Sequence, residues 1–229
     1  MKGRIFLMSL AMAALPALAQ QNDKEYADPK PAPAEAWQGV KKMSLGWGDI
    51  DTRYQRNAVP KLEKALSLYA WKGERVNAQA GLMAPQAINS LSVKASDLKC
   101  GKRTIPASAV STYFVRYVMS DYFNTRKDSC LMADRLEPTT GSMSIEANTL
   151  RPLWVNVDVP QNAEAGKYKG TLTATCDGEE LTIPYTVEVG KRTLPEPSKW
   201  NFHLDLWQNP YSVARHYNVP LWSKKHFEL

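Results

Sequence analysis

Leu153-Trp154-Val155-Asn156-Val157-Asp158-Val159-Pro160 is the stretch that decides the fold, because apolar residues occupy every second position. Successive side chains of a β-strand point to opposite faces of a sheet, so this alternation predicts a strand with one buried face. Pro160 ends the strand, Gly166 turns the chain, and the alternation resumes over residues 168–172. We therefore expect two strands joined by a corner.

The same period-two pattern recurs along the chain, in residues 76–82, 91–95, 113–119 and 181–189. Turn signals separate these runs, among them Asp177-Gly178. Short alternating strands at this spacing predict an all-β fold, an antiparallel β-sandwich of the immunoglobulin-like kind. Residues 60–69 deviate, because Pro60 and a helical spacing of apolar residues predict a short helical turn that becomes a strand near Leu68.

Residues 1–19 have the features of a secretory signal peptide. Lys2 and Arg4 precede an apolar run that ends in Ala17-Leu18-Ala19, the small-residue pattern that signal peptidase accepts. The alternative is an N-terminal membrane anchor, but about 14 apolar residues are too few to span a bilayer. We expect an exported protein, periplasmic or extracellular, with no integral membrane span after cleavage.

Charge argues against a nucleic-acid partner. Loss of Lys2 and Arg4 lowers the formal net charge from +6 to +4. So mild an excess, without a basic stripe or a nucleic-acid motif, bears on solubility and not on nucleic-acid recognition.

Proline-rich segments mark the expected domain boundaries. Residues 20–36 are polar and then rich in proline, which predicts a flexible linker with order beginning near Trp37. The sandwich is expected over residues 37–194. Leu194-Pro195-Glu196-Pro197 is a rigid connector, and residues 195–229 are too short to form a domain of their own.

The cysteines permit at most one disulfide within the chain, because Cys100, Cys130 and Cys176 are odd in number. Cys100 and Cys130 flank one candidate strand and are the expected pair. Three buried free thiols are an equally open alternative. No Cys or His spacing indicates a metal site, and no cofactor is expected.

The candidate substrate-binding residues lie in residues 200–211 and are His203, Asp205, Trp207 and Gln208. On a strand, the first three share one face. A carboxylate and an imidazole there could hydrogen-bond sugar hydroxyls while the indole stacks on a pyranose ring. From spacing alone, an amphipathic strand whose polar residues meet solvent is the alternative.

Several longer motifs occur along the chain: Trp71-Lys72-Gly73-Glu74-Arg75-Val76-Asn77-Ala78-Gln79, Ser96-Asp97-Leu98, Thr149-Leu150-Arg151-Pro152-Leu153-Trp154-Val155, the corner at residues 160–172 and Phe202-His203-Leu204-Asp205-Leu206-Trp207-Gln208-Asn209-Pro210. Together they resemble the N-terminal half of bacterial glycoside hydrolase family 123, over nearly all of residues 40–229. The resemblance implies a β-N-acetylgalactosaminidase-like enzyme, in which a β-sandwich precedes a (β/α)8 barrel and the partner is a glycan with β-linked N-acetylhexosamine. It also implies substrate-assisted retaining hydrolysis with an adjacent Asp-Glu pair.

No Asp-Glu dipeptide occurs in the sequence, so the resemblance implies that this chain holds no catalytic residue. Residues 195–229 would then be the start of a truncated catalytic barrel with its first strand, and the chain would be inactive alone. Glu74, Arg75 and Arg151 are the interdomain candidates, expected to brace the sandwich against the barrel, with ligand contact as the alternative. An autonomous carbohydrate-binding or structural module is the competing function.

Overall fold

The computed structural model describes residues 25–29, 34–120, 130–202, 205 and 207–229. The chain divides into two compact units, one ending at Leu194 and the other beginning at Pro195. The elements of the first unit are α1 (Ala34–Trp37), β1 (Ser44–Gly48), β2 (Leu66–Lys72), β3 (Arg75–Ala84), β4 (Ile88–Ala95), β5 (Leu98–Cys100), β6 (Arg103–Ile105), a 3₁₀ turn (Ala107–Ala109), β7 (Val110–Ser120), β8 (Cys130–Pro138), β9 (Met143–Ile145), β10 (Thr149–Asp158), β11 (Gly166–Cys176) and β12 (Glu179–Thr193). The second unit contains a 3₁₀ turn (Pro197–Lys199), α2 (Pro210–His216) and α3 (Lys224–Phe227).

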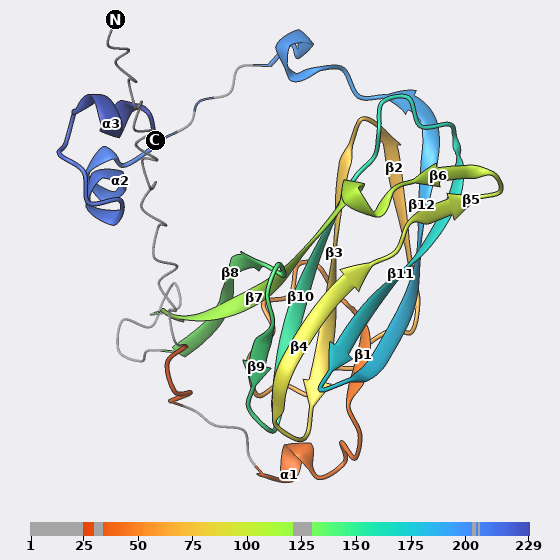
Figure 1. Ribbon diagram of the computed structural model, residues 1–229, viewed down its shortest axis with the longest axis vertical. Coiled ribbons are helices and arrows are strands. Elements are labelled where there is room, and N and C mark those ends of the chain that lie inside the picture. The colour runs from red at the N-terminus through yellow and green to blue at the C-terminus, as the bar shows by residue number, and fades with distance from the viewer. Residues whose placement is uncertain (1–24, 30–33, 121–129, 203–204, 206) are drawn as a thin grey trace, which may run out of the picture. The chain divides into compact units, whose positions relative to one another are not determined.

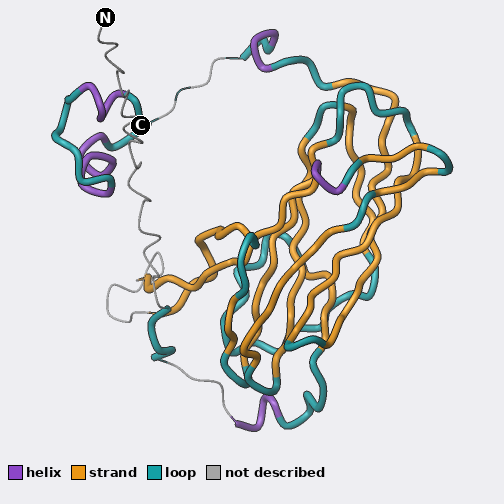
Figure 2. Tube along the Cα trace, viewed as in Figure 1, coloured by secondary structure: helices purple, strands orange, loops and turns teal. Residues whose placement is uncertain are grey.

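The first unit is a sandwich of two β-sheets (Figure 1). One sheet has the strand order β1-β3-β10-β7-β8, and its neighbouring strands are antiparallel. The other has the order β2-β12-β11-β4-β9, with β5 paired to β11 and β6 to β5. Strands dominate this unit (Figure 2), so the predicted all-β sandwich is confirmed at this level. Among the described strand pairs, β2 and β12 alone run parallel.

The strands that decided the prediction lie at the centre of the sheets. β10 pairs with β3 along its whole length, and Leu153, Val155 and Val157 are buried. β11 and β12 form a hairpin at the predicted Asp177-Gly178 turn, where φ is 47° at Asp177 and 94° at Gly178. Two consecutive positive φ angles are what a two-residue type I′ turn requires, and this turn follows the right-handed twist of the strands.

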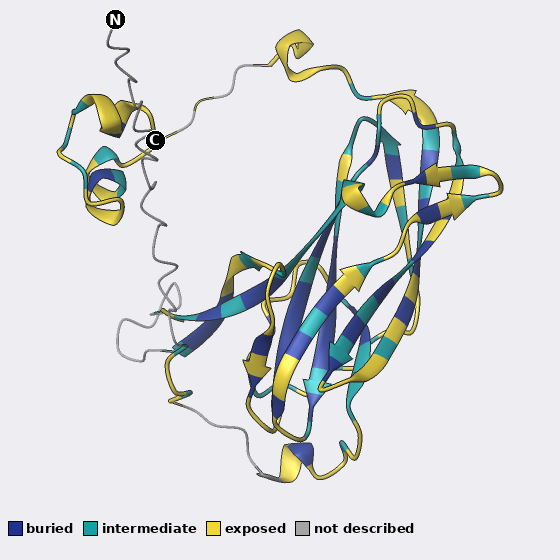
Figure 3. Cartoon of the chain, viewed as in Figure 1, coloured by how far each residue is buried: buried dark blue, intermediate teal, exposed yellow. Residues whose placement is uncertain are grey.

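The main core fills the space between the two sheets (Figure 3). Trp47 on β1 links them: its indole N–H donates to the Pro184 carbonyl on β12 over 2.8 Å, and its ring meets Tyr185 edge-on at 5.4 Å. Because Trp47 is 1% exposed, it contributes packing as well as this bond. It therefore fixes the spacing of the two sheets.

Within residues 60–69, the predicted helical turn is wrong, whereas the predicted strand near Leu68 is confirmed as β2. Glu63 instead exchanges backbone hydrogen bonds with Trp47, at 2.7 and 2.8 Å, and β2 begins at Leu66. Every second residue near Leu66 and Leu68 is apolar, which also suits a strand, and pairing with β1 and β12 overrides the weak helical preference.

A second, smaller apolar cluster covers part of the opposite face of the five-stranded sheet. Phe114 on β7 belongs to the main core, whereas its neighbour Val115 and Tyr117 pack with Leu131 and Ala133 of β8. Because successive side chains alternate, both faces of β7 are buried here. Tyr117 of this second cluster also belongs to the charged site described below.

Candidate functional site

The predicted sugar-binding segment forms no strand in its described residues, which are 200–202, 205 and 207–211. His203 lies outside the described residues. Asp205 and Gln208 are exposed, and Trp207 is 97% exposed. A strand is stable only when neighbours accept and donate its backbone hydrogen bonds. The shared face of His203, Asp205 and Trp207 therefore stays a prediction.

The residues after this segment form two short helices. Asn209 caps α2 by accepting a hydrogen bond from the Ser212 amide over 3.2 Å, and Pro210 starts the helix. His226 of α3 is buried: its Nδ1 accepts from the Trp222 amide at 3.0 Å, and its Nε2 lies 3.0 Å from the Pro210 carbonyl. This pattern assigns the proton to Nε2. His226 therefore holds the two helices together.

Glu74 and Arg75 each have a partner within the sandwich. The Glu74 carboxylate accepts a hydrogen bond from the Trp71 amide over 2.6 Å, which closes the turn from β2 to β3. Arg75 forms a bidentate pair with Asp158 across β3 and β10, at 2.6 and 3.1 Å. Glu74 lies in this turn and Arg75 begins β3, and each binds its own partner. Their interdomain role stays a prediction.

Arg151 is the most deeply buried of the candidates that the structure describes, at 3% exposure. Its two terminal nitrogens donate to the two carboxylate oxygens of Glu25, each over 2.7 Å. One of them also donates to the Val115 carbonyl at 2.9 Å, and the guanidinium lies 4.9 Å from the centre of the Tyr117 ring. Such a fork-to-fork pair is among the strongest arrangements of charged groups in proteins.

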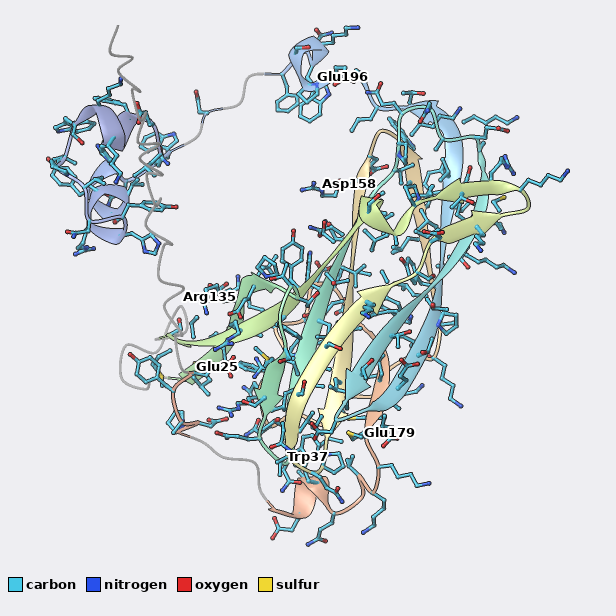
Figure 4. All side chains as sticks on the ribbon, viewed as in Figure 1. Glu25, Trp37, Arg135, Asp158, Glu179 and Glu196 are labelled. Carbon is cyan, nitrogen blue, oxygen red and sulfur yellow. The ribbon has the colours of Figure 1, made fainter. Side chains whose placement is uncertain are left out.

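Two further groups surround the same carboxylate. Arg116 Nε lies 3.1 Å from Glu25 Oε1, and the Tyr117 amide donates to that oxygen over 3.0 Å. We call Glu25, Arg116, Tyr117 and Arg151 the Glu25 site. Figure 4 labels Glu25 on the side of the sandwich formed by β7 and β8.

Electrostatics in the Glu25 site favour the ionised carboxylate. Burial alone raises the pKa of Glu25, but the hydrogen bonds from Arg151 and the Tyr117 amide, with the charges of Arg151 and Arg116, outweigh it and lower the pKa. Burial raises the pKa of Tyr117, whose hydroxyl donates to the Leu150 carbonyl over 2.8 Å. The site is therefore a paired anion and cations beside a neutral phenol.

Sequence reasoning missed the Glu25 site, because residues 20–36 were expected to be a flexible linker. One signal was present. Arg151 interrupts a run of apolar residues that pattern as a buried strand, and a buried arginine requires an anion. Nothing in the sequence identified Glu25 as that anion.

The expected disulfide between Cys100 and Cys130 is not formed. Both are free thiols, as is Cys176, and the expected pair lie on strands of different sheets. Cys100 Sγ instead lies 2.9 Å from a terminal nitrogen of Arg103. Burial, with the nearby charges of Asp177 and Glu179, raises the pKa of Cys176 to about 11, so its thiol stays protonated.

The described residues contain neither a metal-binding cluster nor a membrane-spanning helix. No three or more His, Cys, Asp or Glu side chains in this part of the chain are grouped to hold a metal ion. None of its helices is long and apolar enough to cross a membrane.

Comparison with known proteins defines the class of this sandwich as the N-terminal domain of a glycoside hydrolase. The model of the glycoside hydrolase 123 N-terminal domain matches residues 47–175, more than half of the chain. The chain therefore belongs to glycoside hydrolase family 123, through its N-terminal region.

One solved structure supports the same fold. A family 123 glycoside hydrolase from Clostridium perfringens, determined in a study of glycolipid glycan hydrolysis, matches with a TM-score of 0.73 and 23% identity, over 81% of this chain and 34% of that chain. The chain thus spans about a third of that enzyme's length. PapD-like domain 7 of human CEP192 matches with a TM-score of only 0.31 and 9% identity, over 76% of this chain and 97% of that domain. The comparison with curated proteins finds no match.

Proposed function

We propose that this chain is the N-terminal, non-catalytic part of a secreted glycoside hydrolase that acts on β-linked N-acetylgalactosamine. The family match over residues 47–175 is the observation that carries the proposal, and the shared fold with the Clostridium perfringens enzyme supports it. In this proposal residues 37–194 are an immunoglobulin-like sandwich. Residues 195–229 contribute the first strand of a (β/α)8 barrel, where active sites lie at the carboxyl ends of the strands.

The proposed reaction is substrate-assisted retaining hydrolysis. The 2-acetamido oxygen of the sugar attacks the anomeric carbon and forms a cyclic oxazolinium ion, while one carboxylate orients that amide and a second group, a carboxylic acid, protonates the departing glycosidic oxygen. Water then attacks the anomeric carbon, gives a proton back to the second group and restores the 2-acetamido group. Both carboxylates must reach one sugar residue, and an Asp-Glu dipeptide on one strand end supplies them in the proposal. The sequence contains no such dipeptide, which supports a non-catalytic role for these 229 residues.

The candidate residues take different roles in this proposal. His203, Asp205, Trp207 and Gln208 bind sugar only once the barrel aligns them, and the full exposure of Trp207 suits a stacking platform that needs a neighbouring element. Glu74 and Arg75 lie in and just after the turn from β2 to β3, where they brace the sandwich against the barrel. Arg151 is engaged with Glu25 and contributes through the stability of the sandwich.

Export is part of the same proposal, through cleavage after Ala19. Expression of the full sequence in a bacterium with a periplasm, followed by N-terminal sequencing of the exported chain, is expected to give a mature protein beginning at Gln20. An uncleaved chain retained in the membrane fraction would contradict export by a cleaved signal peptide.

A chromogenic aryl β-N-acetylgalactosaminide tests the non-catalytic role. The purified chain is expected to release no chromophore, whereas a longer chain that joins it to a barrel with an Asp-Glu pair is expected to release it. Replacing that pair by Asn-Gln should abolish release. Turnover by the 229-residue chain alone would contradict the proposal.

Sugar binding by the isolated chain tests the competing function. A carbohydrate-binding module presents aromatic rings in one plane, on which the sugar stacks. The sandwich has a hollow of about 480 Å³ on its second sheet, but none of the residues that line it is aromatic. They are Ser96, Asp97, Lys99, Lys169, Gly170, Thr171 and Pro184. Calorimetric titration with N-acetylgalactosamine oligosaccharides is expected to show no binding. Saturable binding by this chain would favour an autonomous binding module instead.

A further inference from the structure

The Glu25 site has the donor set of a carboxylate receptor. Both oxygens of Glu25 receive an N–H from Arg151 over 2.7 Å, and Oε1 also accepts a hydrogen bond from the Tyr117 amide. Arg116 adds a second positive charge, with its Nε 3.1 Å from Oε1. Arginine pairs with a carboxylate in this forked, planar geometry, which a chloride ion or a single carbonyl cannot reproduce. The arrangement therefore recognises the carboxylate group itself.

The neighbouring arginines have carboxylates of their own. Arg116 also lies 3.4 Å from Glu137, and Arg56 pairs with Glu146 over 2.6 Å. Among the described residues, Glu25 is the one acidic side chain that contacts Arg151. Removing Glu25 would leave the Arg151 guanidinium, 3% exposed, with the Val115 carbonyl and the Tyr117 ring. A buried cation left without its anion is strongly destabilising.

The chain beside Glu25 is also attached to the sandwich. The carbonyl of Tyr26 accepts a hydrogen bond from Arg56 over 3.3 Å, and Arg56 is 6% exposed. Two successive residues of the N-terminal segment thus engage two buried arginines, one through a side chain and one through the backbone. This is a docked segment and not a linker at residues 25–26.

We propose that Arg151, Arg116 and the amide of Tyr117 form a carboxylate-binding site, which Glu25 occupies from within the chain. Residues 25–29 are then a strap docked on the five-stranded sheet. When the Glu25 carboxylate is removed, the site accepts a small free carboxylate such as acetate.

Thermal unfolding of three variants of the full chain tests the pairing. Glu25→Ala is expected to lower the Tm by roughly 10 °C, because it strands a buried guanidinium. Glu35→Ala, an exposed glutamate in the same part of the chain, should leave the Tm unchanged within about 2 °C. Glu25→Ala combined with Arg151→Met removes both charges and should recover at least half of the loss.

The double variant keeps the test decisive if Glu25→Ala fails to fold. A double variant that folds where the single variant does not would support the pairing. A double variant no more stable than Glu25→Ala would overturn it, as would a Glu25→Ala chain with the Tm of the wild type.

Chemical rescue tests the carboxylate site itself. Sodium acetate is expected to raise the Tm of Glu25→Ala by several degrees more than sodium chloride at equal ionic strength, with saturation, since a ligand that binds only the folded state stabilises it. In the wild type and in the Glu25→Ala, Arg151→Met chain, the two salts should differ by no more than about 1 °C. Equal effects of acetate and chloride on Glu25→Ala, or the same acetate effect in the double variant, would overturn the carboxylate site. If Glu25→Ala is unfolded, recovery of its folded far-ultraviolet circular dichroism by acetate and not by chloride replaces the Tm as the readout.

Discussion

Trp47→Ala is expected to lower the free energy of unfolding of the sandwich by about 4–5 kcal/mol. A buried tryptophan removes roughly 200 Å² from water, which at about 25 cal/mol/Å² amounts to about 5 kcal/mol as an upper estimate. Truncation also removes the indole N–H that donates to the Pro184 carbonyl over 2.8 Å, and it removes the edge-on ring contact with Tyr185. Large-to-small changes of this kind cost about 3–5 kcal/mol in other cores.

Urea denaturation followed by circular dichroism measures the difference, with two comparison variants. Trp47→Phe keeps an aromatic ring but loses the bond to the Pro184 carbonyl, so its cost should be about 2 kcal/mol. Trp207→Ala removes the same side chain from a position that is 97% exposed and should change stability by less than about 0.5 kcal/mol. If Trp47→Ala cost no more than Trp207→Ala, the assignment of Trp47 as the link between the sheets would be refuted.

Three other perturbations have defined outcomes. Tyr185→Phe should be neutral or stabilising by up to about 1 kcal/mol in urea melts, because the buried Tyr185 hydroxyl has no hydrogen-bond partner among the described residues; a loss above about 1 kcal/mol would reveal a missed partner. Gly178→Ala should lower the free energy of unfolding by about 1–2 kcal/mol through the φ of 94° alone, since nothing lies within 4 Å of the added methyl group. Gly141→Ala is the control, because that position is equally open but has no positive φ, and it should not destabilise the chain. Because folding lowers the pKa of Glu25, the ionised carboxylate stabilises the folded state fully above its ordinary pKa near 4.5, and this stabilisation is lost as the pH falls through the lower folded value. The difference in unfolding free energy between wild type and Glu25→Ala should therefore shrink below pH 4.5. A difference that stays constant with pH would contradict the lowered pKa.

The sandwich could be predicted because the alternation of apolar residues in the sequence marks the buried face of each strand. The alternation of Val155 and Val157 in β10 and the Asp177-Gly178 turn are local signals, and the structure confirms both. The parallel pairing of β2 with β12 could not be predicted from local signals, since these strands are far apart in the chain. The alternation of apolar residues in β2 would be satisfied equally well at either edge of the sheet. The helical turn predicted within residues 60–69 is wrong for a related reason. The hydrogen bonds between Glu63 and Trp47 are tertiary, and they outweigh a helical preference worth a few tenths of a kcal/mol per residue.

β7 shows where a one-face pattern misleads. Alternation singled out Val115 and Tyr117 as a buried face, but their neighbour Phe114 lies in the main core and they lie in the second cluster. A strand buried on both faces has no polar face to reveal its orientation. The second cluster lies on the outer face of the sheet, over the part formed by β7 and β8.

The Glu25 site was beyond sequence reasoning for an energetic reason. Arg151 in an apolar strand indicates that an anion lies nearby, because burying an unpaired guanidinium costs more free energy than most single interactions contribute to stability. The anion, however, is 126 residues away in a polar segment whose composition alone predicts a linker. Composition measures how much apolar surface a segment can bury, and Glu25 docks through charge. A polar segment next to a domain that contains an unexplained buried arginine should therefore be searched for carboxylates before it is assigned as a linker.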